Sequence, residues 1–206
     1  MCFEDKIETI KNHQNEICAI INNGVIQQYP TIQRIYNQID KTEGDKQKLF
    51  KTFCGFYGIT RCLRTLNEQN LRKLLLQGPQ NKNAVPPLKN IIEQISRNRF
   101  EFSFATKARH TVDNNSPIFD VHVSRFFNGI KVNGNNKEEK FQSAEDVYSQ
   151  LADFYKARGQ NGLAELIHIF DAHFPNTGFS DVKKIDFMIW GWGKLTKKQR
   201  RKHKRS

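Results

Sequence analysis

Two side chains in the middle of this 206-residue sequence, Lys107 and Asp120, have the types and positions needed for chemistry. Each is expected near the start of a short helix, where unpartnered backbone amides and the helix dipole favour negative charge. A carboxylate there can stabilise a developing positive charge or activate a water molecule. A partly neutral lysine is a nucleophile, whereas a solvated ammonium contacts phosphate. The simplest alternative is that Asp120 only caps its helix, because Asp is a common N-cap.

Four other residues near these helices or near the end of the chain could also take part in a site. His110 and His122 lie in the same segment, and without a third ligand nearby neither is expected to bind a metal. Asp186 and Trp192 lie in or next to an expected helix near the end of the chain. That helix is expected to dock on the core; the alternative is that Asp186 or Trp192 lines the same pocket as the first two residues.

Apolar residues recur at helical spacing along almost the whole chain, and strand-like alternation is nearly absent. The pattern predicts a compact all-α fold of eight to ten helices in one domain, residues 1–194, with the active-site segment at 100–127. Helices are expected at 106–112 and 120–127, followed by a polar loop at 133–140 and a capped helix start at Ser143. Other helices are expected over 7–22, from Thr31, over 49–57, within 63–76, and over 87–95, 162–174 and 180–190.

The charge of the chain is concentrated at its end. Lys and Arg number 33 and Asp and Glu 21, a formal charge of +12, and eight of the basic residues fall in the last 13 positions without an acid. The other 193 residues therefore carry only +4. Such a run is typical of a disordered solubilising end or of an arm that binds phosphates without reading sequence. We expect residues 195–206 to form a disordered basic tail.

Four cysteines, Cys2, Cys18, Cys54 and Cys62, are too few for a disulfide framework and are expected to be reduced core thiols. Because they form no Cys-x-x-Cys pair, a cysteine-bound zinc or iron–sulfur centre is excluded, and no cofactor is expected. The longest apolar stretches fall short of the roughly 18 residues that a membrane span needs. The sequence therefore favours a soluble cytoplasmic protein.

The segment around Lys107 and Asp120 resembles the helix-hairpin-helix DNA glycosylase superfamily, which includes endonuclease III and 8-oxoguanine glycosylase. In that family a hairpin leads into a helix that carries a lysine, and a loop then leads to an aspartate at the start of a helix. The run Asp120-Val121-His122-Val123-Ser124-Arg125 is similar to the family's Asp-x-His-hydrophobic-x-Arg-like run. By this resemblance Lys107 stands in the place of the lysine nucleophile and Asp120 in that of the catalytic aspartate. The likeness covers residues 88–130.

The resemblance implies a monomeric, nucleoid-associated enzyme that excises a damaged or modified base, extruded from double-stranded DNA, in base-excision repair or antiviral (anti-phage) defence. Asp120 would stabilise the positive charge that grows on the deoxyribose as the base leaves. Lys107 would either attack the anomeric carbon and add AP lyase activity through a Schiff base, or contact a phosphate. The residues expected to bind DNA are Ser103, Thr106, Arg109, His122 and Arg125 in the body, and Lys197, Lys198, Arg200, Arg201 and Lys202 in the tail.

The sequence departs from the family pattern in three ways. Ser103 and Ala105 stand where the family's hairpin has glycines, which permit the tight turn that approaches a phosphate. Lys107 and Asp120 are only 13 residues apart, fewer than in the family. The cysteines of the iron–sulfur branch are missing, which places the chain nearer the branch without a cluster.

Two other classes of function are also consistent with the sequence. One is a non-catalytic helical DNA- or RNA-binding protein that keeps the scaffold and the basic tail; it would bind with strong salt dependence and release no base. The other is a protein-interaction module of a toxin or defence system, whose nucleic-acid binding would vanish with the tail.

Overall fold

The computed structural model describes residues 2–22, 25–38, 41–59, 66–76, 85–157 and 162–203, with side chains as far as residue 199. These residues form eleven α-helices and no strand, apart from one isolated β-bridge between Leu66 and Ser96. The all-α prediction is confirmed, with more helices than expected. In chain order they are α1 (Phe3–Asn12), α2 (Gln14–Asn22), α3 (Val25–Asn37), α4 (Glu43–Phe56), α5 (Glu68–Leu76), α6 (Leu88–Ile95), α7 (Phe102–Val112), α8 (Val121–Phe126), α9 (Lys137–Lys156), α10 (Leu163–His173) and α11 (Asp181–His203).

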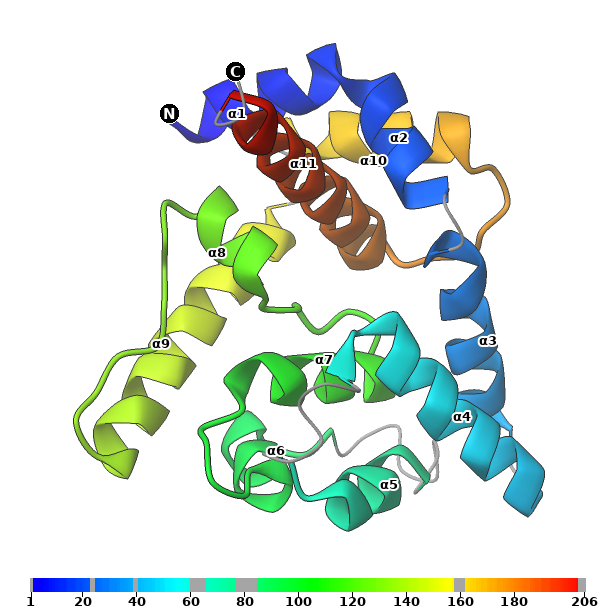
Figure 1. Ribbon diagram of the computed structural model, residues 1–206, viewed down its shortest axis with the longest axis vertical. Helices are drawn as coiled ribbons and strands as arrows, with labels where there is room; N and C mark the ends of the chain where they lie inside the picture. The colour runs from blue at the N-terminus through cyan, green and yellow to red at the C-terminus, as the bar shows by residue number, and fades with distance from the viewer. Residues whose placement is uncertain are drawn as a thin grey trace.

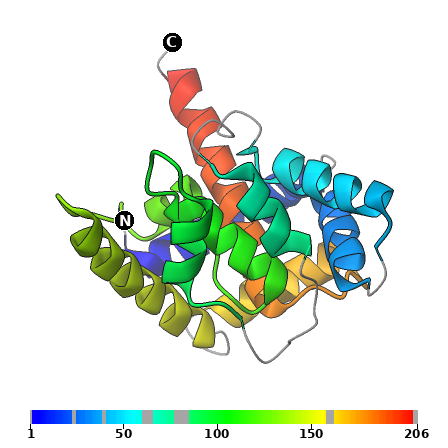
Figure 2. The ribbon, with the colours of Figure 1, turned by 90° about the horizontal axis from the view of Figure 1, so that it is seen from below.

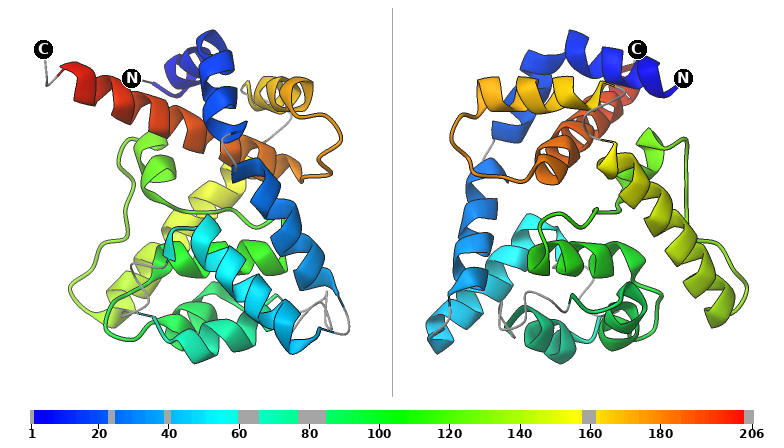
Figure 3. Two further views of the ribbon diagram at one scale, coloured as in Figure 1. Left: turned by 45° about the vertical axis from the view of Figure 1, so that its right-hand side comes forward. Right: turned by 180° about the vertical axis from the view of Figure 1, so that it is seen from behind.

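The helices form two groups that face each other (Figure 1). In the first group α11 packs against α1, α2 and α10. In the second, α5, α6 and α7 contact one another and α4 contacts α5. Helix α3 runs between the groups on one side, and α8 and α9 lie on the other (Figures 1 and 3). Residues 113–120, between α7 and α8, pass between the groups, so the ends of this segment can take part in a site built from both.

Helix α11 is buried on most of its sides. Helices α2, α8 and α10 all pack against it, and the side chains of Val182, Ile185, Met188 and Ile189 are part of the apolar core. A helix that is covered all round normally carries apolar residues at nearly every position. Polar residues on this part of α11 are therefore held inside the protein and need partners there.

The same helix continues well past its expected end at residue 190. It runs to His203, and its last turns project beyond the rest of the protein (Figure 2). Leu195 is still buried, and Lys, Arg and Gln are good helix formers, so the helical hydrogen bonds continue through the basic run. Residues 195–203 are thus the end of a helix, and no break separates them from residues 1–194. Although α11 has 23 residues, no helix in the described residues is long and apolar enough to cross a membrane.

The N-terminal helices differ from expectation at two points. The single helix expected over 7–22 is interrupted at His13, between α1 and α2. Helix α3 contains Pro30, so Thr31 is not its N-cap. The residues before the proline, Ile26 and Tyr29, are buried on the core face of the helix. Their burial offsets the cost of a proline inside a helix, about 3 kcal/mol.

Two helices near the predicted site begin earlier than expected. Helix α9 starts at Lys137, where the Asn136 side chain caps it by accepting a hydrogen bond from the Glu139 amide. Ser143 therefore lies inside α9, and half of the expected loop at 133–140 is helical. Helix α7 starts at Phe102, because Phe102 and the residues after it already pack into the core. The connection between α6 and α7 is consequently residues 96–101, before the positions predicted to form the hairpin.

The cysteines are reduced where the structure describes them. Cys18 and Cys54 are buried thiols, and burial raises the pKa of each to about 11. Cys2 is exposed, contrary to expectation, because it precedes α1 and its sulfur accepts a hydrogen bond from the Asp5 amide. Cys62 and the break expected at residues 77–79 lie outside the described residues.

Candidate active site

Lys107 lies on the buried face of α7. Only 8% of the residue is exposed. Its ammonium donates a hydrogen bond to Ser103 Oγ, one helical turn earlier, at 3.1 Å. The same nitrogen lies 5.1 Å from the ring centroid of Phe104 and 5.8 Å from that of Tyr57. Lys107 is therefore directed into the protein beside aromatic rings, which is where a lysine loses part of its hydration.

Asp120 caps α8, as the simplest interpretation of the sequence predicts. Its Oδ1 accepts hydrogen bonds from the amides of His122, at 2.7 Å, and Val123, at 2.9 Å. Both bonds end on one oxygen, so in the described part of the chain the cap engages one of the two carboxylate oxygens. Amide donors of this kind stabilise the ionised carboxylate. The half-buried Asp120 thus combines a capping role with an oxygen that can serve another purpose.

Thr106 fixes the separation of these two residues. Its hydroxyl donates to the Ser103 carbonyl at 2.9 Å and accepts from the Phe119 amide at 3.0 Å. Thr106 directly precedes Lys107, and Phe119 directly precedes Asp120, so the bond between them ties the neighbours of the two candidate residues together.

A buried ion pair on α11 faces the same region. Lys183 Nζ and Asp186 Oδ2 are 2.8 Å apart, and only 2% and 9% of their side chains are exposed. The Lys183 ammonium is also surrounded by the rings of Tyr29, Phe56 and Phe187, whose centroids lie 4.8, 5.2 and 4.5 Å away. Aromatic faces and a carboxylate both attract an ammonium, and they replace part of the water that it loses on burial.

Lys107 and Asp120 both act on Asp186. Burial raises the pKa of Asp186; the Lys183 ammonium opposes that rise, the Asp120 charge adds to it, and the Lys107 charge opposes it. The Tyr57 ring lies beside both ammoniums, with its centroid 5.6 Å from Lys183 Nζ. Lys107 on α7 thus shares the Tyr57 ring with the ion pair on α11, and the charges of Lys107 and of Asp120, at the start of α8, act on that pair. We call Lys107, Asp120, Lys183 and Asp186 the central charge cluster.

Comparison with known proteins does not identify this arrangement. No family model, curated protein or solved structure matches the chain. The interpretation of the central charge cluster therefore depends on its own geometry. No group of three or more His, Cys, Asp or Glu side chains within the described ranges could hold a metal ion.

Two buried tyrosines, Tyr57 and Tyr155, border the central charge cluster. Within the described residues, the buried hydroxyl of Tyr155 makes no hydrogen bond, and that of Tyr57 faces Thr111. Burial raises the pKa of both, and the negative charge of Asp186 adds to the rise. Both phenols therefore stay protonated and can donate a hydrogen bond. Unsatisfied buried donors are rare in proteins, and the Tyr155 hydroxyl is one of several in the described residues.

His110 lies in the interior beside Tyr29, and its imidazole is neutral. Burial lowers its pKa to about 3. Its Nδ1 is 2.6 Å from the Ser116 carbonyl, to which it must donate, and its Nε2 is 2.8 Å from the Tyr29 hydroxyl, from which it then accepts. Both ring nitrogens are satisfied, so His110 is structural.

Two of the residues expected to bind DNA are buried. Thr106 is fully enclosed, since it joins α7 to the segment before Asp120. His122 packs on α11, where a Cβ added to Gly193 would lie 2.7 Å from its Cγ. Burial lowers the pKa of His122, and its Nδ1 has no partner among the described residues. Neither side chain can contact DNA in this conformation.

The other residues expected to contact DNA differ in how exposed they are. Ser103 is half-buried beneath Lys107, and Arg109 is tied to the protein by bonds to Ser116 Oγ and the Pro86 carbonyl. The exposed cations are Arg125, Lys197 and Lys198. Arg200, Arg201 and Lys202 are in the last turns of α11, with side chains outside the described part of the chain.

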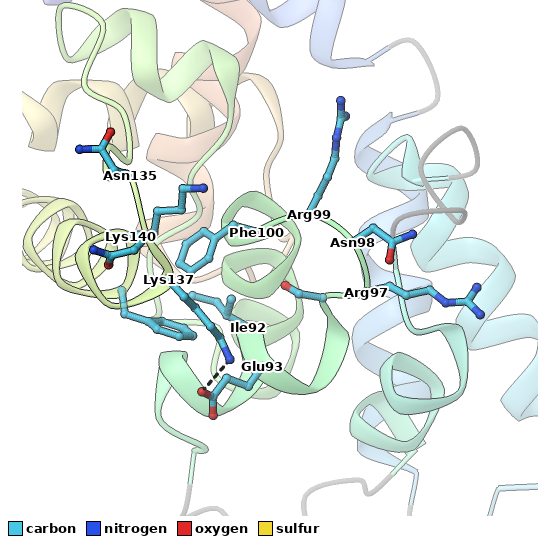
Figure 4. A pocket seen from close by; sticks show the side chains of 12 residues that line it. Ile92, Glu93, Arg97, Asn98, Arg99, Phe100, Asn135, Lys137 and Lys140 are labelled. Atoms are coloured by element: carbon cyan, nitrogen blue, oxygen red, sulfur yellow. Dashed lines mark hydrogen bonds and ion pairs between the residues drawn. The ribbon is translucent and has the colours of Figure 1, made fainter.

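A basic cleft of about 390 Å³ flanks the connection between α6 and α7 and reaches the start of α9 (Figure 4). The Arg97 and Arg99 side chains extend from the connection in diverging directions. Lys137 and Lys140 approach from α9, and the acidic residue of the cleft, Glu93, is 3.4 Å from Lys137. The sequence analysis missed these four cations, because they converge only when the start of α9 folds against α6.

The sequence analysis also missed the partners of Lys107 and Asp120. Asp186 was considered as a pocket residue. Lys183 and the nearby Tyr29, Tyr57 and Tyr155 were not. A lysine and an aspartate three residues apart on one helix suggest an ordinary surface pair. The available signal was their position next to the apolar run at residues 187–190, where a surface pair is out of place.

Proposed function

We propose that the protein is a DNA glycosylase, which cleaves the N-glycosidic bond of a damaged or modified base. The observation that supports the proposal is that Thr106 links α7, which carries Lys107, to the residue before Asp120, and that the buried Lys107 ammonium shares the Tyr57 ring with the Lys183–Asp186 pair. A helix cap and a surface lysine have no reason to meet at such a place. A nucleophile and a charge-stabilising carboxylate do, because both must reach the same sugar carbon.

In this proposal Asp120 stabilises positive charge on the deoxyribose. The amides of His122 and Val123 hold Oδ1, while Oδ2 faces the sugar. The neutral Lys107 amine attacks C1′, the C1′–N bond breaks, and its electron pair leaves with the base. The resulting amine adduct opens to a Schiff base, from which strand cleavage follows.

The basic surfaces supply affinity for the phosphates. Arg97, Arg99 and Lys140 of the cleft, together with Lys197 and Lys198 on α11, are positioned on the outside of the protein where a nucleic acid can reach them. Each cation that pairs with a phosphate releases a counterion and adds salt dependence without reading sequence. Because Lys107 and Asp186 are largely buried, a base extruded from the duplex reaches them only after side chains move.

The test is base release from natural and modified DNAs, measured by mass spectrometry, for the wild type and Asp120→Asn. Asn caps a helix as well as Asp does, so the variant keeps the fold and removes the charge. We expect excision to fall by about 10²-fold or more. Asp153→Asn, an exposed aspartate on α9, is the matched control and retains activity. Full excision by Asp120→Asn contradicts the mechanism.

A second candidate is a non-catalytic helical DNA- or RNA-binding protein. It is favoured by the complete N-cap geometry of Asp120, which a purely structural role explains. This candidate predicts salt-sensitive binding and no released base from any DNA. Borohydride trapping on DNA with an abasic site, with the wild type and Lys107→Met, separates the two, because a covalent complex that is lost in the variant requires a reactive Lys107.

A further inference from the structure

The connection between α6 and α7, which forms one side of the basic cleft, is held in place at both ends. At its start the Asn67 amide donates a hydrogen bond of 2.7 Å to the Ile95 carbonyl. At its end the Glu101 amide donates to Ser96 Oγ at 3.1 Å. Residues 97–100 are therefore presented on an anchored backbone, which lowers the entropy that a ligand must overcome to bind them.

Three cations of this cleft are available to a ligand. Within the described ranges, no side-chain hydrogen bond or ion pair engages Arg97, Arg99 or Lys140. The acidic residue that lines the cleft, Glu93, lies 3.4 Å from Lys137 and is neutralised by it. Arg97 and Arg99 are exposed and project from the connection (Figure 4). Such a group of unpaired cations attracts phosphate groups in preference to a neutral ligand.

An aromatic pair lines the same cleft. The rings of Phe100 and Phe141 meet edge to face, with their centroids 5.1 Å apart. Phe141 is only 6% exposed, and the ammoniums of Lys89 and Lys137 lie 5.2 and 5.4 Å from its centroid. Phe100 is half-buried, and in the described part of the chain no cation lies over its ring. Phe100 is thus the aromatic surface that a ligand can reach.

Unpaired cations beside an accessible ring are typical of sites for unpaired nucleotides. Proteins that bind single strands combine a positively charged groove, which follows the phosphates, with aromatic side chains on which bases stack. In a duplex the faces of the bases are covered by their neighbours, so a duplex offers phosphates to the cleft but no base to Phe100. The volume of about 390 Å³ lies within the range of about 300–1,000 Å³ of sites that hold small organic groups.

A second hollow beside the cleft favours a strand over a free nucleotide. Arg97 lines both, and the hollow, of about 520 Å³, continues from it past Asn67 and Gln69 at the start of α5. The other cation of the hollow, Arg72, is paired with Glu68 at 2.8 Å and adds little net charge. A free nucleotide would occupy the cleft alone, whereas consecutive nucleotides of a strand occupy the cleft and the hollow, with Arg97 between them.

We propose that the basic cleft and this hollow form a binding site for a single strand of nucleic acid. A base stacks on Phe100, the phosphates beside it pair with Arg99 and Lys140, and the next phosphate pairs with Arg97. Stacking accepts any base and phosphate contacts read no sequence, so the site binds unpaired strands without sequence preference. The inference goes beyond the proposed function, because it requires no reaction at Lys107.

The experiment compares the affinities of two strands by fluorescence anisotropy. One is oligo(dT) and the other consists of abasic residues, and both have about 20 nucleotides, more than the roughly 4–16 that such sites cover. Because the phosphates are the same, the basic end of α11 contributes equally to both. The wild type should prefer oligo(dT) by about tenfold or more, and Phe100→Leu, which keeps an apolar side chain against Phe141, should remove that preference. Equal affinities in the wild type, or a preference that survives in Phe100→Leu, overturn the proposal.

The phosphate contacts have a readout of their own. Arg99→Gln/Lys140→Gln removes two cations of the cleft that hold no described partner, so the fold is kept. The slope of log K against log salt for oligo(dT) should become shallower by about 1.4, since each phosphate contact on a single strand contributes about 0.7. Lys11→Gln/Lys156→Gln makes the same change in net charge on α1 and at the end of α9, and should leave the slope as it is. If the two double variants change the slope equally, the proposal is wrong.

Photocrosslinking of the wild type decides the matter if Phe100→Leu does not fold. Oligo(dT) that carries one 5-iodouracil is irradiated on the protein, and the tryptic peptides are sequenced by mass spectrometry. The adduct is expected at Phe100, in the peptide Phe100–Lys107. Adducts confined to α11 overturn the proposal. Thymidine 5′-monophosphate at the same nucleotide concentration should not suppress the adduct, because it cannot span the cleft and the hollow; suppression would assign the cleft to a free nucleotide instead.

The failure of the proposed function gives a different pattern. If no base is released and no covalent complex is trapped, the stacking and salt readouts still hold, because they measure binding at equilibrium. Base release together with equal affinities for oligo(dT) and the abasic strand overturns this inference alone. The loss of affinity of Phe100→Leu for oligo(rU), compared with its loss for oligo(dT), tells whether the site takes RNA, DNA or both, each of them as a single strand.

Discussion

Alanine at Gly193 and at Gly55 should change the stability of this protein in opposite directions. Both glycines lie inside helices, α11 and α4. A Cβ at Gly193 would lie 2.7 Å from Cγ and 2.8 Å from Cβ of the buried His122, whereas a Cβ at Gly55 meets nothing within 4 Å. Alanine is better than glycine in a helix by about 1 kcal/mol at either site. The difference between the two variants therefore measures the close approach of α8 and α11.

The expected magnitudes follow from these contacts. Overpacking a rigid core costs about 1–3 kcal/mol. We take the upper end because several atoms of one buried ring are overlapped. After the gain in helix propensity, Gly193→Ala should lower the free energy of unfolding by about 2 kcal/mol, and Gly55→Ala should raise it by about 1 kcal/mol. For a chain of this size the corresponding shifts in Tm are about 4–8 °C down and about 2–4 °C up.

Urea unfolding with an unchanged m-value is the assay. A double variant provides an internal check, since His122→Ala removes the ring that the new methyl group would strike. The cost of Gly193→Ala should then shrink, which gives a favourable coupling of at least about 1 kcal/mol in the cycle. A Gly193→Ala protein as stable as the wild type would refute the described packing of α8 on α11.

Three other predictions test the surroundings of the site. Thr106→Val should reduce the free energy of unfolding by about 1–3 kcal/mol in urea titrations, because it leaves the Phe119 amide without its acceptor. Burial lowers the pKa of His110 from 6.5 to about 3, so between these pH values the unfolded chain binds a proton that the folded chain does not. His110 should therefore lower the free energy of unfolding by up to about 1.4 kcal/mol for each pH unit below 6.5. His110→Asn should remove this pH dependence. Lys197→Ala/Lys198→Ala should reduce the slope of log K against log salt for DNA binding by about 2, measured by fluorescence anisotropy.

Each of these predictions has a matched control. Thr106→Ser keeps the hydroxyl and should lose less stability than the valine variant. The pH comparison needs only the difference between wild type and variant, in which the opposing contribution of Asp186, whose pKa is raised by burial, cancels. Lys48→Ala/Lys51→Ala removes two exposed cations from α4 and should leave the salt slope unchanged. Equal slopes for both lysine pairs would contradict a role for the end of α11.

The fold class could be predicted from the sequence because helical periodicity is a local property. The apolar spacing in α6, for example, places Leu88, Ile91, Ile92 and Ile95 on one buried face, as expected. The ends of helices were less predictable, since competing caps decide them. Ser143 has the pattern of a helix start, yet the Asn136 cap begins α9 seven residues earlier. Sequence pattern alone does not weigh one cap against another.

The candidate site was predictable only in part, for a different reason. Asp120 and its capping geometry follow from nearby residues, and the structure places Asp120 as the sequence predicted. The surroundings of Lys107 depend on Tyr57 and Lys183, which come from distant parts of the chain. Thr106 illustrates the limit: its type suited a DNA contact, but its tertiary partner, Phe119, places it in the interior.

The unbroken course of α11 sets a length scale for any duplex that the protein engages. From Lys183 to Lys197 the helix rises about 21 Å, at about 1.5 Å per residue. Along one DNA strand, with about 3.4 Å per step, that distance corresponds to about six nucleotides. A footprint centred on the extruded nucleotide should therefore extend about six positions further on the side of α11. One residue inserted after Thr196 would turn the basic face by about 100° and abolish that asymmetry without touching the core.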